Sequence, residues 1–413
     1  MSTAATTAFW HGQAHMPTVK RAERVIVRGE GAFVWDADGN RLFDATASLW
    51  YCNIGHGRRE IAEAVFEQMT RIEAYATFQQ YATPPPLELS ERLAAIAPFP
   101  SAKVFLTSGG SDAIDVAAKL ARRYWNAAGQ PEKQTLVTRT RAYHGLHGIG
   151  TSITGLDFNR EGFGRLVPDT ARVPTNDAEA LAELFASRAD EIAAFICEPV
   201  IGTGGVIPPA PGYLDTAIRL CREHDVLFVA DEVITGFGRT GRMFASERFG
   251  IEPDMLVFAK GVTSGYMPVG GVLVGERIWD PFWADGSDLI FRHGLTYSGH
   301  ASACAAAIAN LDVLERERLV DRVAELEPVL VSELAPLAEL PRVAEVRCGV
   351  GLLAGVELAD AALVPAVLEG CHERGVLTRL LAPSTLQVSP PFVATGDDLA
   401  TMVSVFGEAI EAA

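Results

Sequence analysis

The sequence predicts an α/β protein whose larger part is a doubly wound, mostly parallel sheet. From about residue 58, stretches with helical periodicity alternate with short apolar or β-branched runs. The runs are KVFL, TLVT, AAFIC, LFVAD and MLVF, and polar or glycine-rich residues follow every one of them. This alternation is typical of a parallel sheet with crossover helices, in which ligands bind beyond the carboxyl ends of the strands.

The elements are expected in a clear order along the chain. Residues 23–47 alternate strand-like runs with turn signals, and DADGN around Gly39 predicts a hairpin turn. The prolines of 83–88 are interpreted as the start of a helix, because proline favours the first helical turn. A long helical stretch at 301–334 leads out of the sheet domain. Helices are expected over 58–72, 87–97, 112–127, 177–193 and 211–224.

We expect two domains, because 413 residues exceed what a single small core organises. The large α/β domain is expected to span 58–300. The smaller α+β domain is expected to combine both chain ends, 1–57 and 301–413.

Composition excludes several classes of function. A formal net charge of −17 argues against nucleic acid as the main partner, since phosphate binding needs a basic surface. No apolar stretch approaches the roughly 18–20 residues of a membrane span, and the N-terminal MSTAATTAFWHGQAH is not a secretory signal. The six scattered cysteines are expected to be reduced, mostly buried thiols, and no zinc or other metal site is expected. We therefore expect a soluble cytoplasmic protein.

The segment TSGGSDA places Gly109, Gly110 and Ser111 directly before a predicted helix. Backbone N–H groups at a helix start, together with a hydroxyl, form an anion site suited to phosphate. The alternative is a simple cap, with Ser111 as the N-cap residue. The segment is not a P-loop, because no GK[ST] follows.

Lys260 and Asp231 each follow a buried apolar run, on what should be neighbouring strands. Most lysines are solvated surface charges, which is the alternative for Lys260. Burial would instead lower the pKa of its amine and allow attack on a carbonyl. An amine, a carboxylate and a phosphate cradle at one sheet edge suit pyridoxal 5′-phosphate, which needs a lysine, an acid for its ring nitrogen and an anion site.

Four motifs in order, YHG, DEVITGFGRTG, FAKGVTSGYMPVGG and TYSGH, carry a specific resemblance. From about Arg28 to Phe392 the chain resembles the class III (subgroup II) aminotransferases of the fold type I pyridoxal-phosphate superfamily. The resemblance implies that Lys260 holds the cofactor covalently and then moves a proton. It implies that Asp231 bonds the ring nitrogen.

The resemblance also implies the remaining cofactor contacts and a homodimer with shared active sites. Thr296 is expected to reach the phosphate of the other subunit. Glu198 either supports the ring region or is a paired buried acid, and His144 and Arg239 are interpreted as structural partners rather than catalysts. The other expected cofactor-binding residues are Gly110 and Ser111 at the phosphate, Tyr143 and Val233 at the ring, and His144 beside them.

Three positions depart from the family pattern. Asp112 replaces the usual glutamate, Gly109 replaces the usual serine, and Ala301 follows His300 where proline is common. None of them touches the lysine–aspartate chemistry.

Several substitutions indicate a substrate branch. Thr203 in EPVIGTGG and Ile234 stand where enzymes acting on ornithine, acetylornithine or 4-aminobutyrate typically carry glutamate and glutamine. The chain instead resembles the ω-amino acid or amine:pyruvate branch. The expected substrate-binding residues are Trp50, Phe78, Tyr143 and Arg379. For Trp50 and Phe78 the alternative is core packing, and for Arg379 it is a surface ion pair.

The expected function is a pyridoxal-phosphate-dependent aminotransferase. It would move an amino group from an ω-amino acid or amine to pyruvate or a similar 2-oxo acid, through the pyridoxamine form of the cofactor. The alternatives are a diaminopelargonate- or 4-aminobutyrate-type enzyme and, less favoured, an aminomutase or racemase on the same fold. A non-catalytic protein is disfavoured by the intact Lys260 and Asp231. A Rossmann dehydrogenase is disfavoured by the missing GxGxxG.

Overall fold

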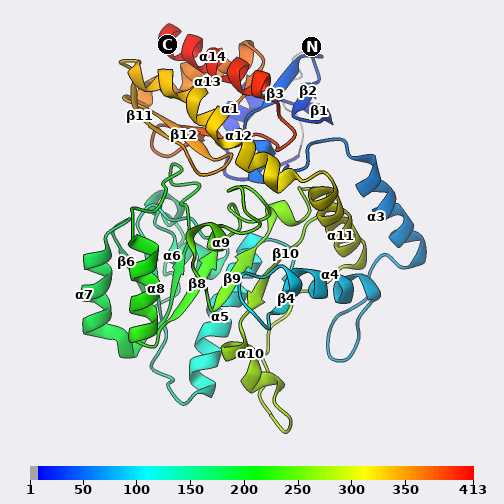
Figure 1. Cartoon of the computed structure of the whole chain (residues 1–413), viewed down its shortest axis with the longest axis vertical. Helices are drawn as coiled ribbons and strands as arrows, with labels where there is room; N and C mark the ends of the chain where they lie inside the picture. The colour runs from blue at the N-terminus through cyan, green and yellow to red at the C-terminus, as the bar shows by residue number, and fades with distance from the viewer. Residues whose placement is uncertain (1–7) are drawn as a thin grey trace.

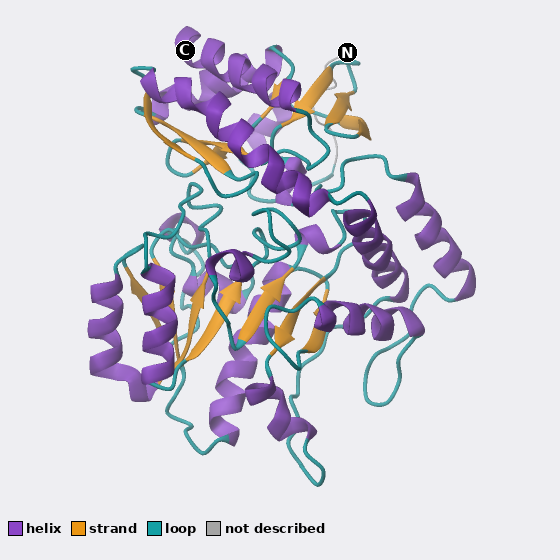
Figure 2. Cartoon of the chain, viewed as in Figure 1, coloured by secondary structure: helices purple, strands orange, loops and turns teal. Residues whose placement is uncertain are grey.

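A seven-stranded sheet forms the lower half of the computed structural model, which describes residues 8–413 (Figures 1 and 2). Its strand order is β4–β10–β9–β8–β7–β5–β6. Strand β10 runs antiparallel to both neighbours and every other pair is parallel, which confirms the mostly parallel α/β sheet. The strands are β4 (Lys103–Thr107), β5 (Thr135–Arg139), β6 (Thr170–Val173), β7 (Ile192–Cys197), β8 (Leu227–Asp231), β9 (Met255–Phe258) and β10 (Gly270–Val274).

The five helices predicted from periodicity are present as α3, α4, α5, α7 and α8, within about five residues of the expected ranges, whereas α6, α9 and α10 were not predicted. The proline run does begin a helix, with Thr83 as the residue before it. The helix expected over 177–193 ends at Arg188, because the buried strand β7 already begins at Ile192. The helices are α3 (Arg59–Arg71), α4 (Pro84–Ala95), α5 (Gly110–Ala127), α6 (Gly148–Ile153), α7 (Ala178–Arg188), α8 (Tyr213–Glu223), α9 (Ala245–Phe249) and α10 (Glu276–Trp283).

The structure corrects the single long helix expected over 301–334. It is two helices, α11 (Ala301–Arg316) and α12 (Leu319–Leu334). Between them Arg318 takes a left-handed φ of 51°, which ends one helix and turns the chain into the next. Neither proline nor glycine stands at this break, so the sequence carried no breaker signal.

Above the large sheet lie two smaller four-stranded sheets, near both chain termini (Figure 1). In one of them β13, from the C-terminal part of the chain, pairs in parallel with β3, from the N-terminal part. Gly39 lies in the turn between β2 and β3 with a φ of 88°, which confirms the predicted hairpin. The domain limits at 57/58 and 300/301 stay predictions. The two sheets contain β1 (Ile26–Glu30), β2 (Phe33–Asp36), β3 (Arg41–Asp44) and β13 (Val376–Leu377), and β11 (Val343–Arg347), β12 (Ala354–Leu358), β15 (Thr385–Val388) and β14 (Leu380–Leu381).

Four further helices belong to the chain ends. They are α1 (Met16–Arg21), α2 (Ala47–Trp50), α13 (Val364–Glu373) and α14 (Gly396–Ala412). No helix in residues 8–413 is long and apolar enough to cross a membrane. The stretch 1–15, on which the absence of a secretory signal was judged, lies partly outside the described residues.

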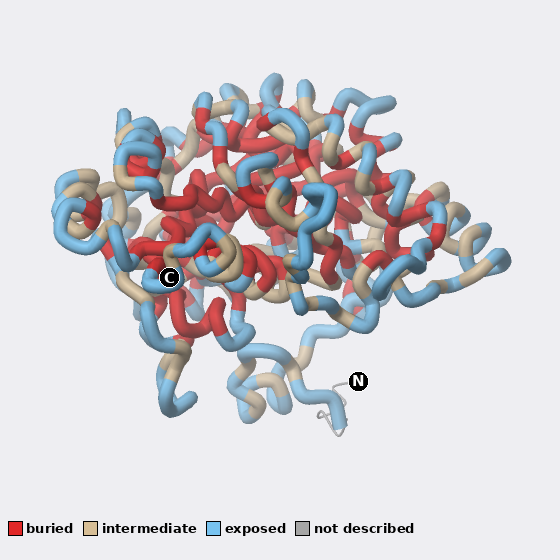
Figure 3. The backbone as a smooth tube through the Cα atoms, turned by 90° about the horizontal axis from the view of Figure 1, so that it is seen from below, coloured by how far each residue is buried: buried red, intermediate tan, exposed pale blue. Residues whose placement is uncertain are grey.

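The core runs through the middle of the sheet, where the backbone is buried from both sides (Figure 3). Strands β8 and β9 are buried along their whole lengths. Five of the six cysteines are buried and Cys348 is half-buried, as expected. Polar side chains at the ends of such strands are therefore held against a rigid base.

Candidate active site

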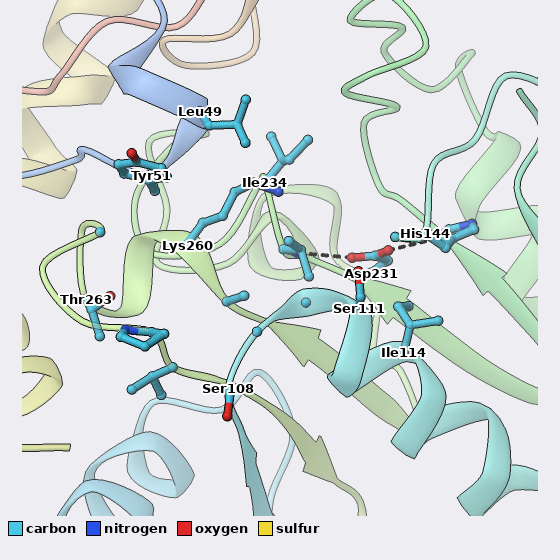
Figure 4. Close-up of a pocket in the computed structure, with 18 of the residues that line it drawn as sticks. Leu49, Tyr51, Ser108, Ser111, Ile114, His144, Asp231, Ile234, Lys260 and Thr263 are labelled. Carbon is cyan, nitrogen blue, oxygen red and sulfur yellow. Dashed lines mark hydrogen bonds and ion pairs between the residues drawn. The ribbon is translucent and has the colours of Figure 1, made fainter. Parts of the chain in front are cut away.

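A cavity of about 400 Å³ lies at the edge where the parallel strands end (Figure 4). The segments that follow β4, β5, β7, β8 and β9 all contribute to it, as does a loop near residue 50. Its lining includes Leu49, Tyr51, Ser108, Gly109, Gly110, Ser111, Tyr143, His144, Glu198, Asp231, Val233, Ile234, Ala259 and Lys260. The structure thus brings together most of the predicted cofactor-binding residues.

Asp231 is the last residue of β8, and its carboxylate is held in a fixed orientation. One oxygen accepts the Val233 N–H at 3.1 Å, and the other lies 2.7 Å from His144 Nδ1 (Figure 4). An ionised carboxylate can only accept hydrogen bonds, so Nδ1 of the fully buried His144 is the donor in this pair. His144 therefore acts as a positioning partner of Asp231.

Glu232, the neighbouring acid, turns away from the cavity. Its two oxygens accept the backbone N–H groups of Ala245 and Ser246, which begin α9, and the hydroxyls of Ser246 and Thr235. Burial raises the pKa of Glu232, and these hydrogen bonds oppose the rise. The two consecutive carboxylates thus serve different purposes, one facing the cavity and one fixing a helix start.

Lys260 lies two residues after the end of β9 and lines the cavity, with its side chain extending toward Ile234 (Figure 4). Its φ of 46° is left-handed, a strained conformation for a residue with a side chain and one that concentrates at functional sites. Burial lowers the pKa of the Lys260 amine to about 8, and Asp231 opposes that shift while Arg379 adds to it. A substantial fraction of this amine is therefore neutral near physiological pH.

The start of α5 provides free donors at the cavity wall. Gly109 precedes the helix and no side chain caps it. The Ser111 hydroxyl instead accepts the Leu146 N–H at 3.2 Å, so the interpretation of Ser111 as N-cap is wrong. A Cβ on Gly110 would lie 3.0 Å from a side-chain carbon of Val233, so a larger residue there would require Val233 to shift. Uncapped N–H groups at the start of a long helix favour an anion.

Glu198 is buried behind the cavity and bonds backbone donors rather than a cation. Its oxygens accept the N–H groups of Tyr143 and Gly202, each at 2.9 Å. Burial raises the pKa of Glu198, and the nearby His144 opposes the rise. Glu198 thereby fixes the backbone of Tyr143, whose ring lines the cavity.

The residues present fit pyridoxal 5′-phosphate. One cavity combines a lysine amine of lowered pKa, an oriented carboxylate and the uncapped start of α5 beside a close-packed glycine. These are the three groups that the cofactor needs. The individual contacts to it remain predictions.

Within one chain, Trp50 does not line the cavity that contains Lys260. Its side chain is 1% exposed and packs in a core cluster with Val206 and Leu353, while its neighbours Leu49 and Tyr51 line the cavity. Left-handed φ angles at Ala47, Ser48 and Trp50 turn the indole inward. Its position matches the core-packing alternative.

Phe78 and Thr296 do not line the cavity that contains Lys260. Phe78 is half-exposed and lines a second cavity of about 840 Å³, together with residues 290–294. Thr296 is exposed beside that segment. Within one chain, neither residue therefore meets the predicted cofactor-binding residues.

Arg379 is half-buried, and in residues 8–413 no ion pair holds it, so the surface ion-pair alternative is wrong. Its Nε donates to Gln387, and its guanidinium lies 5.6 Å from the centre of the Trp50 ring. Burial lowers the pKa of Arg379 to about 10, and Tyr143 opposes the shift. Gln387 was not predicted from the sequence, although a glutamine inside the apolar run TLQV was a signal.

Arg239 is a structural residue, as interpreted from the sequence. It is fully buried and donates to Asn53 at 2.7 Å and to the carbonyl of Pro390 at 2.6 Å. It joins the segment after β8 to both chain ends.

Comparison with known proteins places these features in a wider group. A family model described as aminotransferase class-III matches residues 16–410. A putrescine–pyruvate aminotransferase of Pseudomonas aeruginosa is 37% identical over 91% of this chain and 87% of its own length. A mitochondrial gamma-aminobutyrate transaminase of Oryza sativa is 36% identical over 94% of this chain and 81% of its own. The solved structure of an (S)-enantioselective omega-transaminase from Thermomicrobium roseum superposes with a TM-score of 0.93, at 39% identity, over 97% and 96% of the two chains.

Proposed function

From the premise that the chain belongs to the class III aminotransferase family, we propose that its donor is an amine or ω-amino acid and its acceptor is pyruvate or a similar 2-oxo acid. The enzyme itself is a pyridoxal-phosphate-dependent transaminase. The observation that carries the substrate proposal is the uncompensated charge of Arg379 near Tyr143 and Lys260. A planar guanidinium binds a carboxylate with two parallel hydrogen bonds, which suits a 2-oxo acid.

When bound, pyridoxal 5′-phosphate supplies a carbonyl that carries the amino group and an electron-poor ring that takes up electrons. The residues of this chain supply the rest. Lys260 takes and returns a proton, since its lowered pKa allows both states near neutral pH. Asp231, held by His144 and the Val233 N–H, provides a negative charge for a protonated ring nitrogen. The start of α5 binds the phosphate.

A second candidate is a 4-aminobutyrate-type enzyme, which the rice relative favours. Against it, Thr203 and Ile234 replace the glutamate and glutamine expected for that branch. Both candidates use the same lysine and aspartate, so only the substrates distinguish them.

The test follows the absorbance of the bound cofactor in the purified holoenzyme. The donors are 1-phenylethylamine, β-alanine, 4-aminobutyrate and L-alanine, and pyruvate is the acceptor. Loss of the long-wavelength band with L-alanine and an amine, restored by pyruvate, is the expected result. Bleaching by 4-aminobutyrate alone would favour the second candidate. No bleaching by any donor would overturn the substrate proposal.

The homodimer and the cytoplasmic location also belong to the proposal. The exposed Thr296 and the half-exposed Phe78 both lie outside the lining of the Lys260 cavity, which supports their use by a partner subunit. Sedimentation equilibrium checks the dimer. If the holoenzyme is a monomer at catalytic concentrations, the shared active site is wrong.

A further inference from the structure

Gln387 is fully buried in β15, and its amide orientation is determined by its neighbours. Its Nε2 donates to Ser389 Oγ at 2.6 Å and to the Thr46 carbonyl at 3.2 Å. Ser389 Oγ in turn donates to the same carbonyl, so it is free to accept from the amide. Because the Thr46 carbonyl and Ser389 Oγ both accept from Nε2, the amide of Gln387 is oriented with Oε1 on the opposite side.

Oε1 faces Arg379 and accepts its Nε–H. The backbones are joined as well, because the Gln387 N–H donates to the Arg379 carbonyl at 3.1 Å. Arg379 comes directly before β14, which pairs with β15, so both residues belong to one hairpin. The Arg379 guanidinium is therefore held at its Nε by Gln387, a rigid neighbour.

The partner of Arg379 is neutral, and this has an electrostatic consequence. An amide oxygen orients a guanidinium without cancelling its charge, whereas a carboxylate would do both. The Arg379 guanidinium also lies over the Trp50 ring, and Tyr143 and Lys260 are near enough to interact with its charge. Its two terminal nitrogens make no hydrogen bond with residues 8–413. They remain available for a ligand anion.

We propose that Gln387 is a positioning residue that makes the enzyme select acceptors with a carboxylate. It orients Arg379 through Nε and leaves both the charge and the two terminal nitrogens for the acceptor. This inference rests on the proposed function, because it assigns the acceptor carboxylate to Arg379.

The test compares Gln387→Glu with Gln387→Met in the holoenzyme. Glutamate keeps the shape, and Ser389 Oγ can rotate to donate to it, but it adds a charge that cancels that of Arg379. Methionine removes the hydrogen bond and leaves the charge. The measured quantity is the ratio of kcat/KM for pyruvate to kcat/KM for butanal, an acceptor without a carboxylate. General damage to the enzyme cancels in this ratio.

Gln387→Glu is expected to lower the ratio by about 10- to 100-fold, the range for losing a charge-assisted hydrogen bond. Gln387→Met is expected to lower it by about three- to tenfold, because Arg379 keeps its charge but loses its orientation. The dissociation constant for propionate, measured by calorimetry, should rise in the same order. This second readout needs no turnover.

Three outcomes decide the matter. A ratio within about twofold of the parent enzyme in both variants would overturn the proposal. If the ratio falls equally in both variants, the charge of Arg379 is not what selects the acceptor. If Gln387→Glu does not fold, Gln387→Met alone still tests whether Gln387 orients Arg379. Arg379→Met separates a failure of the Gln387 proposal from a failure of the proposed function. If it leaves the ratio unchanged, the acceptor site is not at Arg379 and the proposed function fails there.

Discussion

The cavity has two sides that are built in different ways. The strand-end side includes residues 108–111, Asp231 and Lys260. On the other side Leu49 and Tyr51 line the cavity, and the adjoining hairpin of residues 377–388 reaches their neighbour Trp50 through Arg379. We call residues 47–51 together with this hairpin the hairpin side. On the strand-end side, Asp231 ends and Lys260 follows a buried strand, and the parallel pairing of these two strands fixes where both residues emerge. On the hairpin side, position depends on the left-handed backbone at Ala47, Ser48 and Trp50 and on a network of side-chain hydrogen bonds. The chemistry common to the family lies on the strand-end side, and we propose that the hairpin side determines substrate choice.

Replacing Lys260 makes the strongest test of this division. Lys260→Ala should reduce the amine half-reaction by about 10⁴-fold or more, because it removes both the nucleophile and the proton carrier. Single-turnover absorbance with 1-phenylethylamine measures it. The matched control is Lys20→Ala, an exposed lysine far from the cavity in the fold. Activity within a factor of about ten of the parent would place the chemistry elsewhere.

The neighbouring acids Asp231 and Glu232 test whether function and stability separate on the strand-end side. Asp231→Asn should slow turnover by about 100-fold, because an amide cannot balance a protonated ring nitrogen. Glu232→Gln should instead lower the free energy of unfolding by about 1–3 kcal/mol, since its NH₂ group would face the donors of Ala245 and Ser246. Turnover and urea unfolding of both variants provide the check. Equal turnover losses would show that Glu232 also takes part in the chemistry.

The pH dependence of cofactor attachment tests the environment of Lys260. With a pKa of about 8, the neutral amine increases about tenfold between pH 7 and pH 9 and then reaches a plateau. The rate at which the apoenzyme regains the cofactor should follow that curve. An amine with the ordinary value of 10.5 would give an increase of about 100-fold without a plateau. The second result would mean that burial does not lower the pKa of Lys260.

The same division explains what the sequence could predict. Asp231 and Lys260 were located because an apolar strand followed by a polar residue is a local pattern, and parallel strands end at one edge. Strands β6 and β10 were missed, since TARV is polar and GGVLV begins with glycines that resemble a loop. The break at Arg318 left no trace, because any residue can occupy a left-handed position when packing around it compensates.

On the hairpin side, residue types could be predicted from the sequence but side-chain directions could not. Trp50 was expected at the pocket, yet three left-handed residues around it reverse which side chains face inward. The pattern of apolar and polar residues cannot predict such a reversal, because its interpretation assumes a regular helical or extended backbone. Gln387 was missed for a related reason. Its role depends on Ser389, Thr46 and Arg379 meeting in space, and Thr46 lies far away in sequence.

The smallest expected effects lie at Leu49 and Trp50, and they test this reversal directly. Leu49 is 47% exposed at the cavity, so Leu49→Ala should change the preference between small and bulky amines by up to about tenfold without destabilising the protein. Trp50→Phe removes buried volume and should lower the free energy of unfolding by about 1–3 kcal/mol, with little change in preference. The measurements are kcat/KM for 2-aminobutane against 1-phenylethylamine and urea unfolding. If Trp50→Phe changes the preference while Leu49→Ala does not, the indole faces the substrate and the interpretation from sequence is the better one.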